Sequence, residues 1–516
     1  MHVWFPLALV VAAVVFQLVI RILALDEPIE RDSGIYLEVA NSLLDGRTLY
    51  TEALDIKPPG IYTVVAVFSL FLSSSGLVLF FVACSALLIA GLSLWRVLQL
   101  AGVPPILSSF ALCLGSLFAA DIGIEGTQPN VEMWMNATLL LGASFLVRGP
   151  ERTGSLWIAA ACLAASSLFK HVAVIPVAAM SASMAVTMLA VGQYARAAKL
   201  FFAIMTAGLC VWLAFALWCV AVGSAAQAWQ TLGIYPFEYS MIQRGESETA
   251  FLAVLFNGYS IDALTPAVWP WLWQVVAIAV GGCIWSLIEA DEESGSRHRL
   301  AALTLGWLFA TPAAVDLPGG GYPHYLQLWL PPLLLGTALL LDRLLVHSRI
   351  FSGVLMVLLL VVGVSRGWPL VAASPAEWSV SKYGDQFLRA QRAGAHVKTV
   401  LEEGERVFVW GVFPGIYVEA GQWPEVGTAN VWLTLPGYGA NLAEDASSSL
   451  ERDLRLKPPD MIVLDPFTMR QTPSEHVVGR WISQNYGVFA RSNGFLFAAR
   501  KGSDLEQRES ARASGQ

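Results

Sequence analysis

Long runs of apolar residues separated by short polar loops fill the first 370 positions of the chain. A helix needs about 20 apolar residues to cross a bilayer. Eleven segments meet this requirement, and we predict them as membrane spans: 4–25, 76–99, 104–120, 130–148, 155–170, 172–190, 200–222, 268–290, 300–316, 323–342 and 350–368. The apolar run 61–75 is shorter, which is typical of an interfacial or re-entrant helix. The pattern therefore predicts an α-helical polytopic membrane module over residues 1–370.

The pattern changes beyond residue 370, where short apolar runs alternate with amphipathic stretches. Such runs predict short buried strands at 407–410, 461–464 and 495–499, and helices at 385–402, 441–456 and 474–484. We therefore predict a small α/β domain over residues 371–501. The polar segment 502–516 is expected to be disordered, because it holds too little apolar surface to offset the entropy of ordering.

The composition supports this division of the chain. The chain is 56% hydrophobic and 14% charged, whereas a soluble domain has about 25% charged residues. Of the 70 charged residues, 32 lie at or beyond Glu377, so charge is concentrated in the predicted C-terminal domain. The formal net charge of −8 argues against a nucleic-acid partner, because such binding rests on lysine and arginine contacts to phosphates.

Basic residues in the short loops determine the predicted orientation. The loops 121–129 and 317–322 have no lysine or arginine, whereas five loops on the opposite side hold nine: Arg96, Arg148, Arg152, Arg196, Lys199, Arg297, Arg299, Arg343 and Arg349. This is a positive-inside distribution, provided that 61–75 does not cross the membrane and the N-terminus is cytoplasmic. We therefore predict that the first outer loop (26–75) and the C-terminal domain are extracytoplasmic.

The first outer loop holds the most informative polar residues. Asp32 occupies an N-cap position ahead of a helix whose apolar residues recur at helical spacing until Gly46. The acid is either a plain N-cap or a carboxylate that faces a reaction cleft. Lys57, in the turn Lys57-Pro-Pro-Gly60, is either a snorkelling lysine or an ammonium group that faces a lipid phosphate.

Further polar residues lie at the ends of predicted spans. Glu132 enters the fourth span, where an acid is costly unless it is paired or hydrated; the alternative is a solvated helix start, which favours negative charge. Lys170 stands between two short spans, where snorkelling is the alternative to a functional role. His324, Tyr325 and Gln327 open the tenth span as either a cavity lining or an aromatic interfacial belt.

The sequence leaves the question of a metal open. Asp32, Glu132 and His324 could together hold a divalent cation, but no ligand spacing typical of a metal site accompanies them. The chain also has no Walker or Rossmann motif. We therefore predict no cofactor other than an optional divalent cation.

At these positions the sequence resembles the GT-C membrane glycosyltransferases, and more narrowly the bacterial protein-mannosyltransferase and aminoarabinose-transferase group of glycosyltransferase family 39 type. In many of these relatives a glutamate follows the first-loop acid directly, whereas Ser33 follows Asp32 here, and the Asp26-Glu27 pair competes for the role. The resemblance covers most of residues 1–340 and rests on the first-loop acid followed by Tyr36, Lys57-Pro58-Pro59, Glu132, Phe169-Lys170, and His324-Tyr325-Leu-Gln327 with Pro331-Pro332.

The resemblance implies inverting transfer of a sugar from a polyprenyl-phosphate donor to a lipid, glycan or protein acceptor, at the outer face of the bacterial cytoplasmic membrane. Asp32 would act as the catalytic base, and Glu132 would orient the acceptor, the lysine or a cation. Lys57 would stabilise the leaving phosphate. The other implied substrate contacts are Arg31, Tyr36, Lys170, His324, Tyr325 and Gln327.

Two other classes of function compete with this interpretation. A transporter or flippase for a lipid-linked or polar substrate is the main alternative, but such proteins usually place ionisable groups near mid-membrane and often show repeated halves. The candidate residues here gather at one interface, and the chain shows no internal repeat. An assembly or sensor protein would leave the first-loop residues unexplained.

Overall fold

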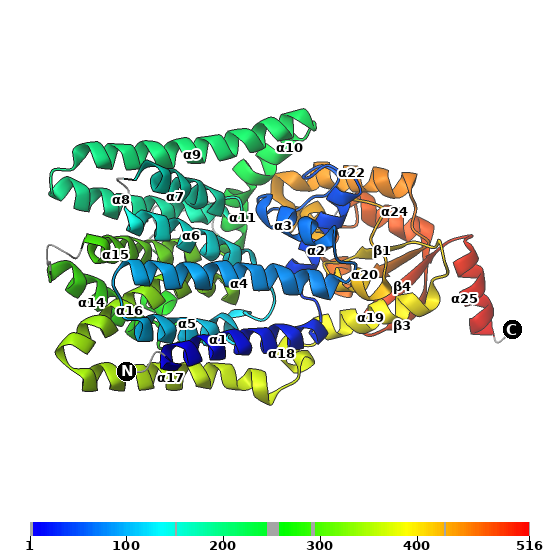
Figure 1. Ribbon diagram of the computed structural model, residues 1–516. Coiled ribbons are helices and arrows are strands. Elements are labelled where there is room, and N and C mark those ends of the chain that lie inside the picture. Colours follow the sequence, from blue (N-terminus) through cyan, green and yellow to red (C-terminus); the bar gives the residue numbers. More distant parts are fainter. Residues whose placement is uncertain (1–3, 150–151, 245–256, 290–294, 428–429, 515–516) are drawn as a thin grey trace.

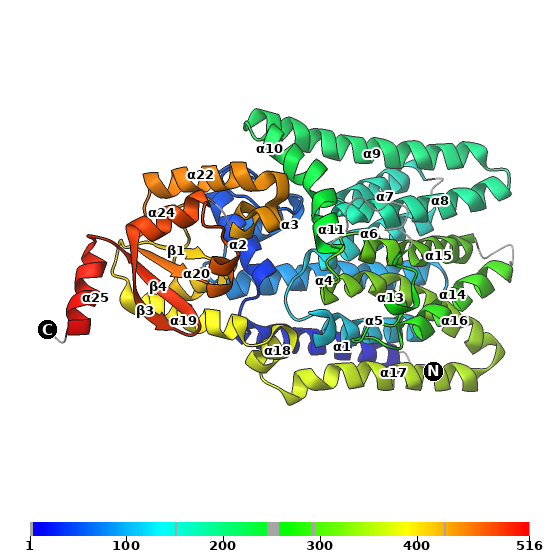
Figure 2. The ribbon, with the colours of Figure 1, turned by 180° about the vertical axis from the view of Figure 1, so that it is seen from behind.

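The computed structural model describes residues 4–149, 152–244, 257–289, 295–427 and 430–514. The last residue of the predicted span 268–290 and the last two residues of the predicted tail 502–516 lie outside this description. Long helices run side by side through one half of the molecule, and a smaller domain with a sheet occupies the other end (Figure 1). The same division is visible from behind (Figure 2).

Each predicted span coincides with a helix of the bundle. Six stretches of the described chain, which contain α1, α4, α8, α9, α16 and α17, are long and apolar enough to cross a membrane. The chain is thus a multi-pass membrane protein, while the number of eleven spans stays a prediction. The bundle helices are α1 (Trp4–Leu23), α4 (Ser75–Leu100), α5 (Pro105–Ala119), α6 (Val131–Arg148), α7 (Thr153–Ser166), α8 (Val174–Ala190), α9 (Tyr194–Ala221), α14 (Leu272–Ile288), α15 (Gly295–Asp316), α16 (Leu330–His347) and α17 (Arg349–Ala372).

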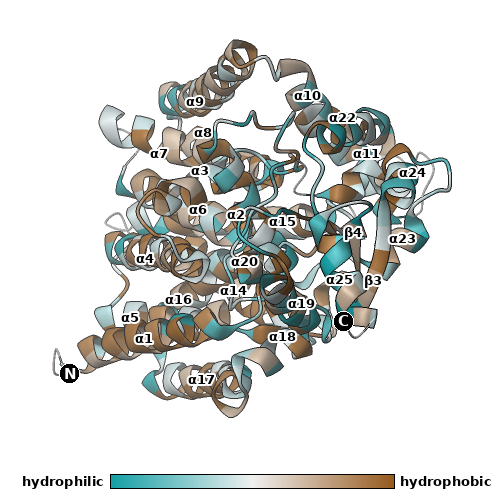
Figure 3. Ribbon diagram, turned by 90° about the vertical axis from the view of Figure 1, so that its right-hand side faces the viewer, coloured by the Kyte–Doolittle hydropathy of each residue, from teal (hydrophilic) through white to brown (hydrophobic). Residues whose placement is uncertain are grey.

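Apolar side chains on the outside of the bundle are those that face lipid. Helix α9 leaves Phe201, Phe202 and Leu209 more than half exposed, and α17 does the same with Ile350 and Phe351. Exposed apolar rows of this length are unfavourable in water. The hydropathy colouring shows α1 largely hydrophobic, whereas α22 and α25 at the opposite end carry hydrophilic segments (Figure 3).

Shorter elements gather at the end of the bundle that faces the C-terminal domain. The predicted interfacial run 61–75 forms only α3 (Gly60–Ser69), which precedes α4. The expected helix after Asp32 is α2 (Arg31–Leu44). The remaining short elements in the first 350 residues are η1 (Ala24–Asp26), η2 (Ile122–Ile124), η3 (His171–Ala173), α10 (Ala225–Trp229), η4 (Gln230–Ile234), α11 (Tyr235–Arg244), α13 (Ile261–Leu264) and η5 (Pro323–Trp329).

The C-terminal part is a four-stranded sheet flanked by helices. The sheet order is β1-β2-β4-β3; β1 pairs with β2 in parallel, and both other pairings are antiparallel. The three predicted strands are confirmed as β1 (Val407–Trp410), β2 (Met461–Leu464) and β4 (Phe495–Arg500). The other elements are β3 (Tyr486–Ser492), α18 (Pro375–Tyr383), α19 (Gln386–Val400), α20 (Gly415–Ala420), η6 (Val431–Thr434), α21 (Pro436–Gly439), η7 (Ala440–Leu442), α22 (Ala443–Leu456), α23 (Pro466–Gln471), α24 (Val477–Asn485) and α25 (Asp504–Ser514).

Two features of this domain depart from the sequence prediction. Strand β3 was not expected, because its burial pattern is irregular and lacks a clear alternation. The segment expected to be disordered forms α25, in which Leu505 is fully buried. Arg508 of this helix pairs with Glu405 at 2.7 Å, so tertiary contacts order a segment whose composition alone favours disorder.

The C-terminal domain lies against the first outer loop. The Arg47 side chain donates a hydrogen bond to the carbonyl of Pro424 at 2.8 Å. Helix α2 packs so closely here that a Cβ atom on Gly34 would come within 2.5 Å of the Pro414 ring. The domain and the first outer loop are therefore on the same side of the bundle, as the loop charges predicted.

Candidate active site at the junction of the two parts

Helix α2, which carries the predicted catalytic base Asp32, is capped by Glu30 and not by Asp32. The Glu30 carboxylate accepts hydrogen bonds from the backbone N–H groups of Asp32 at 2.6 Å and Ser33 at 2.5 Å. The prediction that Asp32 is the N-cap is thus wrong, because a glutamate two residues upstream already reaches these donors. Asp32 lies within the first turn, where its own carboxylate is available for other partners.

Asp32 forms an ion pair with Lys57. Lys57 Nζ lies 3.3 Å from Asp32 Oδ2 and 3.9 Å from Asp55 Oδ2. The Asp55 side chain is fully buried, and it also accepts a hydrogen bond from the Tyr62 hydroxyl. Tyr36 presents its ring to the ammonium group at 5.0 Å from the ring centroid. Lys57 is thus held between two carboxylates and a tyrosine ring.

The proline-rich turn places Lys57 by packing against the segment before Lys170. The Gly60 N–H donates a hydrogen bond to the carbonyl of Leu168 at 2.8 Å. A Cβ atom at Gly60 would lie 2.6 Å from that carbonyl oxygen, so only glycine permits this close approach. Tyr50 adds a hydrogen bond from its hydroxyl to the carbonyl of Lys57 at 3.0 Å.

A second ion pair joins Glu132 to Lys170. The Glu132 side chain is fully buried at the start of α6, and Lys170 Nζ is its partner. The same ammonium group lies 3.4 Å from the ring centroid of Tyr325. One carboxylate oxygen of Glu132 has no hydrogen-bond partner within the described residues. The pair is therefore a buried cation and anion with one acceptor still available.

His324 is paired with an acid that the sequence prediction did not include. His324 Nδ1 lies 2.7 Å from Glu125 Oε2. Glu125 adopts a left-handed backbone conformation with φ of 56°, which is uncommon for a residue with a side chain. Gln327 donates to the carbonyl of Ile124 at 3.0 Å. The Gln327 amide nitrogen thus anchors the loop that carries Glu125.

The charge of His324 in η5 acts on Asp32 of the first outer loop, together with the charges within that loop. Burial alone would raise the pKa of Asp32, but the charges of Lys57, Arg31 and His324 outweigh it and hold that pKa below its usual range. Burial lowers the pKa of Lys57, and the charges of Asp32 and Asp55 reverse this and raise it. Both groups of the central pair are therefore charged near neutral pH.

Tyr36 lies between the two ion pairs. Its side chain is fully buried, and its hydroxyl has no hydrogen-bond partner among the described residues. Burial raises the pKa of Tyr36 well above its usual value, and the carboxylates of Asp32 and Glu132 add to this effect. The Tyr36 hydroxyl is therefore a neutral donor within the field of both acids.

The C-terminal domain contributes Trp432 to this region. The guanidinium carbon of Arg31 lies 5.4 Å from the Trp432 ring and 5.8 Å from the Tyr322 ring. Trp432 is itself held by a hydrogen bond from its indole N–H to Thr468 at 3.0 Å. Arg31 Nε lies 3.9 Å from Asp32 Oδ1. The domain thus positions the second cation beside the central carboxylate.

We expect Trp432→Ala to lower turnover by about 2- to 30-fold, the range that corresponds to one cation–π contact, because Arg31 would lose one of its two aromatic partners. Trp432→Phe keeps a ring and should retain most of the activity. The check is the activity of both variants in membranes at matched protein levels. Equal losses in both variants would mean that the indole packing, and not the ring face, is what matters.

The described residues do not support the metal site considered from sequence. No three histidine, cysteine, aspartate or glutamate side chains within them come together as a metal-binding group. The reason is that each candidate ligand has its own partner: Asp32 has Lys57, Glu132 has Lys170, and His324 has Glu125. The alternative acid Glu27 pairs with Lys382 of α18 instead.

Besides the Glu30 cap, sequence reasoning missed Asp55, Glu125 and Trp432. Asp55 stands two positions before Lys57 in the same loop, so the charge pattern of that loop could have indicated it. Glu125 lies in an outer loop without basic residues, but only the fold brings it to His324. Trp432 carries no local signal, because its role depends on how the C-terminal domain docks.

Comparison with known proteins places this geometry in a wider context. No family model and no curated protein matches the chain. ArnT from Cupriavidus metallidurans bound to undecaprenyl phosphate is similar with a TM-score of 0.60 at 14% sequence identity, over 98% of this chain and 99% of that chain. The apo state of ArnT is similar with a TM-score of 0.56 at 15% identity, over 95% and 97% of the two chains.

A second solved protein shows the same likeness. AglB from Archaeoglobus fulgidus is an oligosaccharyltransferase solved with an inhibitory peptide and a dolichol-phosphate, and the match has a TM-score of 0.54 at 12% identity. It covers 97% of this chain and 75% of that chain. At such low identity the likeness concerns the fold. The chain therefore has the same fold as ArnT and AglB over nearly its whole length.

Proposed function

We propose that this chain is a membrane glycosyltransferase, which moves a sugar from a polyprenyl-phosphate donor to a lipid, glycan or protein acceptor at the outer face of the cytoplasmic membrane. Residues 1–370 form its membrane module, with the first outer loop at 26–75, and residues 371–501 form an extracytoplasmic domain. The fold, and the lipid phosphates present in two of the similar structures, support this proposal.

The observation that carries the proposal is the ion pair between Asp32 and Lys57 at 3.3 Å. Each side chain is only 17% exposed, so the pair is largely shielded from bulk water. A partly buried ammonium group suits a lipid phosphate, and a carboxylate beside it suits the acceptor hydroxyl. A transporter would have no need for such a pair at one end of its helices.

The reaction follows from these two groups. The acceptor oxygen attacks the anomeric carbon, its proton passes to Asp32, and the bond between that carbon and the phosphate oxygen breaks with inversion. Lys57, with Arg31 nearby, stabilises the charge that develops on the departing polyprenyl phosphate. If the acceptor is itself a phosphate, no base is needed, and Asp32 positions the sugar instead.

Donor binding would also prepare the base. A phosphate that approaches Lys57 competes with Asp32 for the ammonium group. Since the charge of Lys57 is the largest influence that lowers the pKa of Asp32, partial loss of that contact raises the pKa and makes the carboxylate a better proton acceptor. Glu132 and Lys170 would then hold the acceptor side of the centre through the free Glu132 oxygen.

The direct test uses membranes that contain the protein and a polyprenyl-phosphate sugar with a radiolabel in the sugar. Transfer of label to the lipid, glycan or protein fraction, absent from membranes without the protein, supports the proposal. Mass spectrometry of the same fractions from a deletion strain identifies the sugar and the acceptor. Label that crosses sealed vesicles while still attached to its polyprenyl phosphate would favour the flippase alternative.

The predicted orientation gives a further test. Val346, in the last turn of α16, is 70% exposed and lies on the predicted cytoplasmic side. We expect Val346→Cys to resist a membrane-impermeant thiol reagent in intact cells and to react after permeabilisation. Glu403→Cys, on the exposed surface of the C-terminal domain, is the matched control and should react without permeabilisation. The opposite labelling pattern would reverse the topology.

A further inference from the structure

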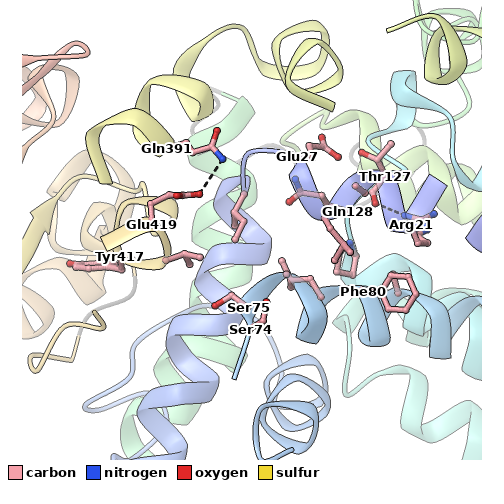
Figure 4. Close-up of a pocket in the computed structure, with 18 of the residues that line it drawn as sticks. Arg21, Glu27, Ser74, Ser75, Phe80, Thr127, Gln128, Gln391, Tyr417 and Glu419 are labelled. Carbon is pink, nitrogen blue, oxygen red and sulfur yellow. Dashed lines mark hydrogen bonds between the residues drawn. The ribbon is translucent and has the colours of Figure 1, made fainter. Parts of the chain in front are cut away.

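A separate cavity of about 400 Å³ lies between the membrane helices and the C-terminal domain. Its lining includes Leu79 and Phe80 of α4, Arg21 of α1, and residues of α19 and α20. Neither Asp32 nor Lys57 lines it. Figure 4 shows Arg21, Thr127 and Gln128 toward one side of the cavity and Glu419 and Gln391 toward the other. The cavity is therefore distinct from the proposed catalytic centre.

The cavity has an apolar floor and a polar rim. Ala24 and Leu25 of η1, which follows α1, with Leu79, Phe80 and Ala83 of α4, form the apolar part. These are the ends of two predicted spans, so the floor lies where the bilayer meets water. The rim carries hydroxyl and amide groups: Ser73, Ser74, Ser75, Thr127, Gln128 and Gln391. An amphiphile fits such a division better than a wholly soluble ligand does.

Arg21 brings a buried positive charge to the cavity: among the described residues no carboxylate lies within ion-pair distance of it, and the acid whose charge reaches it, Glu27, is already paired with Lys382. The residue is 2% exposed, and its side chain donates only to neutral oxygens, those of Thr127, Gln17 and Ala119. Its Nε has no hydrogen-bond partner among the described residues. A buried cation is costly unless an anion accompanies it. A phosphate at this end of the cavity would supply that anion.

The opposite rim disfavours a second phosphate. Glu419 accepts a hydrogen bond from the Gln391 amide at 3.1 Å, and within the described part of the chain no ion pair to a cation is found for it. The other lining acid, Glu27, is compensated by Lys382. A carboxylate beside amides and hydroxyls suits sugar-like hydroxyl groups, which both donate and accept hydrogen bonds. Trp423 adds an aromatic surface to this rim.

We propose that this cavity binds the headgroup of a membrane lipid in which a phosphate is esterified to a sugar or a similar polyol. The phosphate lies toward Arg21, the hydroxyl groups lie along Gln128, Gln391 and Glu419, and the acyl chains follow α1 and α4. Gln128 links this cavity to the catalytic loop, because its side chain donates to the carbonyl of Pro28 at 2.9 Å and accepts from Glu30 N–H at 3.1 Å.

Native mass spectrometry of the full chain released from nanodiscs tests the proposal. The nanodiscs contain equal amounts of three probes: phosphatidylinositol, which has phosphate and polyol; phosphatidic acid, which has only the phosphate; and monoglucosyl-diacylglycerol, which has only the sugar. We expect about tenfold more phosphatidylinositol than either other probe to be retained on the protein. Each of the other probes lacks one of the two groups and would lose one or two hydrogen bonds. Equal retention of the three probes would overturn the proposal.

Variants at the rim connect retention to this cavity. We expect the double variant Glu419→Ala/Gln391→Ala to lose the preference for phosphatidylinositol over phosphatidic acid. Glu403→Ala, an exposed glutamate of the same domain, should keep it. Unchanged melting temperatures show that both variants are folded, and an unchanged preference in the double variant would refute the site. Because the experiment measures binding, it works equally in Asp32→Asn and is independent of the proposed transferase activity.

Discussion

Asp32→Asn should lower sugar transfer by about 10²- to 10⁴-fold, the range typical of a lost general base. The asparagine amide has nearly the same shape but cannot accept the acceptor proton. It also removes the charge that pairs with Lys57 at 3.3 Å. The measurement is label transfer from the polyprenyl-phosphate sugar in membranes at matched protein levels.

Asp45→Asn is the matched control for this variant. Asp45 lies at the other end of the same helix, and its side chain is 64% exposed, so its loss should leave transfer unchanged. The melting temperature of both variants should stay close to that of the parent, since Glu30 and not Asp32 caps the helix. Full activity in Asp32→Asn would remove the acid from the mechanism, or would point to an acceptor that needs no base.

Lys57→Ala should reduce transfer by about 10²- to 10³-fold, comparable to the loss of one fixed donor to a developing oxyanion. The loss should appear both in the KM for the donor and in kcat, because the ammonium group would contact the phosphate before and during departure. Lys57→Arg keeps the charge and should recover part of the activity. Lys398→Ala, an exposed lysine of α19, should have no effect.

The pH dependence of Lys57→Ala has a definite sign. In the parent chain the charge of Lys57 helps to hold the pKa of Asp32 below its usual range, against burial that raises it. Without Lys57, fewer charges oppose the effect of burial, so the pKa of Asp32 rises. Less of the Asp32 carboxylate is then ionised at a given pH. Residual transfer should therefore fall at a higher pH on acidification than in the parent. If Lys57→Ala changed only the KM for the acceptor, the proposed role of Lys57 at the donor phosphate would be contradicted.

The membrane architecture was largely predictable because it depends on local composition. Each predicted span coincides with a helix, since a run of apolar residues in lipid must satisfy its backbone internally. The same reasoning found β1 and β2, which are buried throughout, and β4, which is buried at four of its six residues. It failed for β3, an edge strand that within the described residues pairs only with the adjacent β4, and for α25, whose Arg508 pairs with the distant Glu405.

The candidate site was predictable as a set of residues but not as a set of contacts. Asp32 and Lys57 were recognised from one loop, and they do meet. The pairing of Glu132 with Lys170 and of His324 with Glu125 required the packing of separate helices. The cap formed by Glu30 was missed because aspartate is a more usual N-cap than glutamate.

The sequence by itself determined the membrane helices and the residue types available for chemistry, because hydropathy is a property of one continuous stretch of chain. The side of the membrane on which the loops lie stays a prediction from their charges. Only the tertiary structure decided which charges neutralise each other. It holds Lys57 between Asp32 and Asp55, places Trp432 against Arg31, and leaves Arg21 Nε without a hydrogen-bond partner among the described residues. Coulomb energies depend on distances of a few ångströms between elements that lie far apart in the chain, and packing alone establishes those distances.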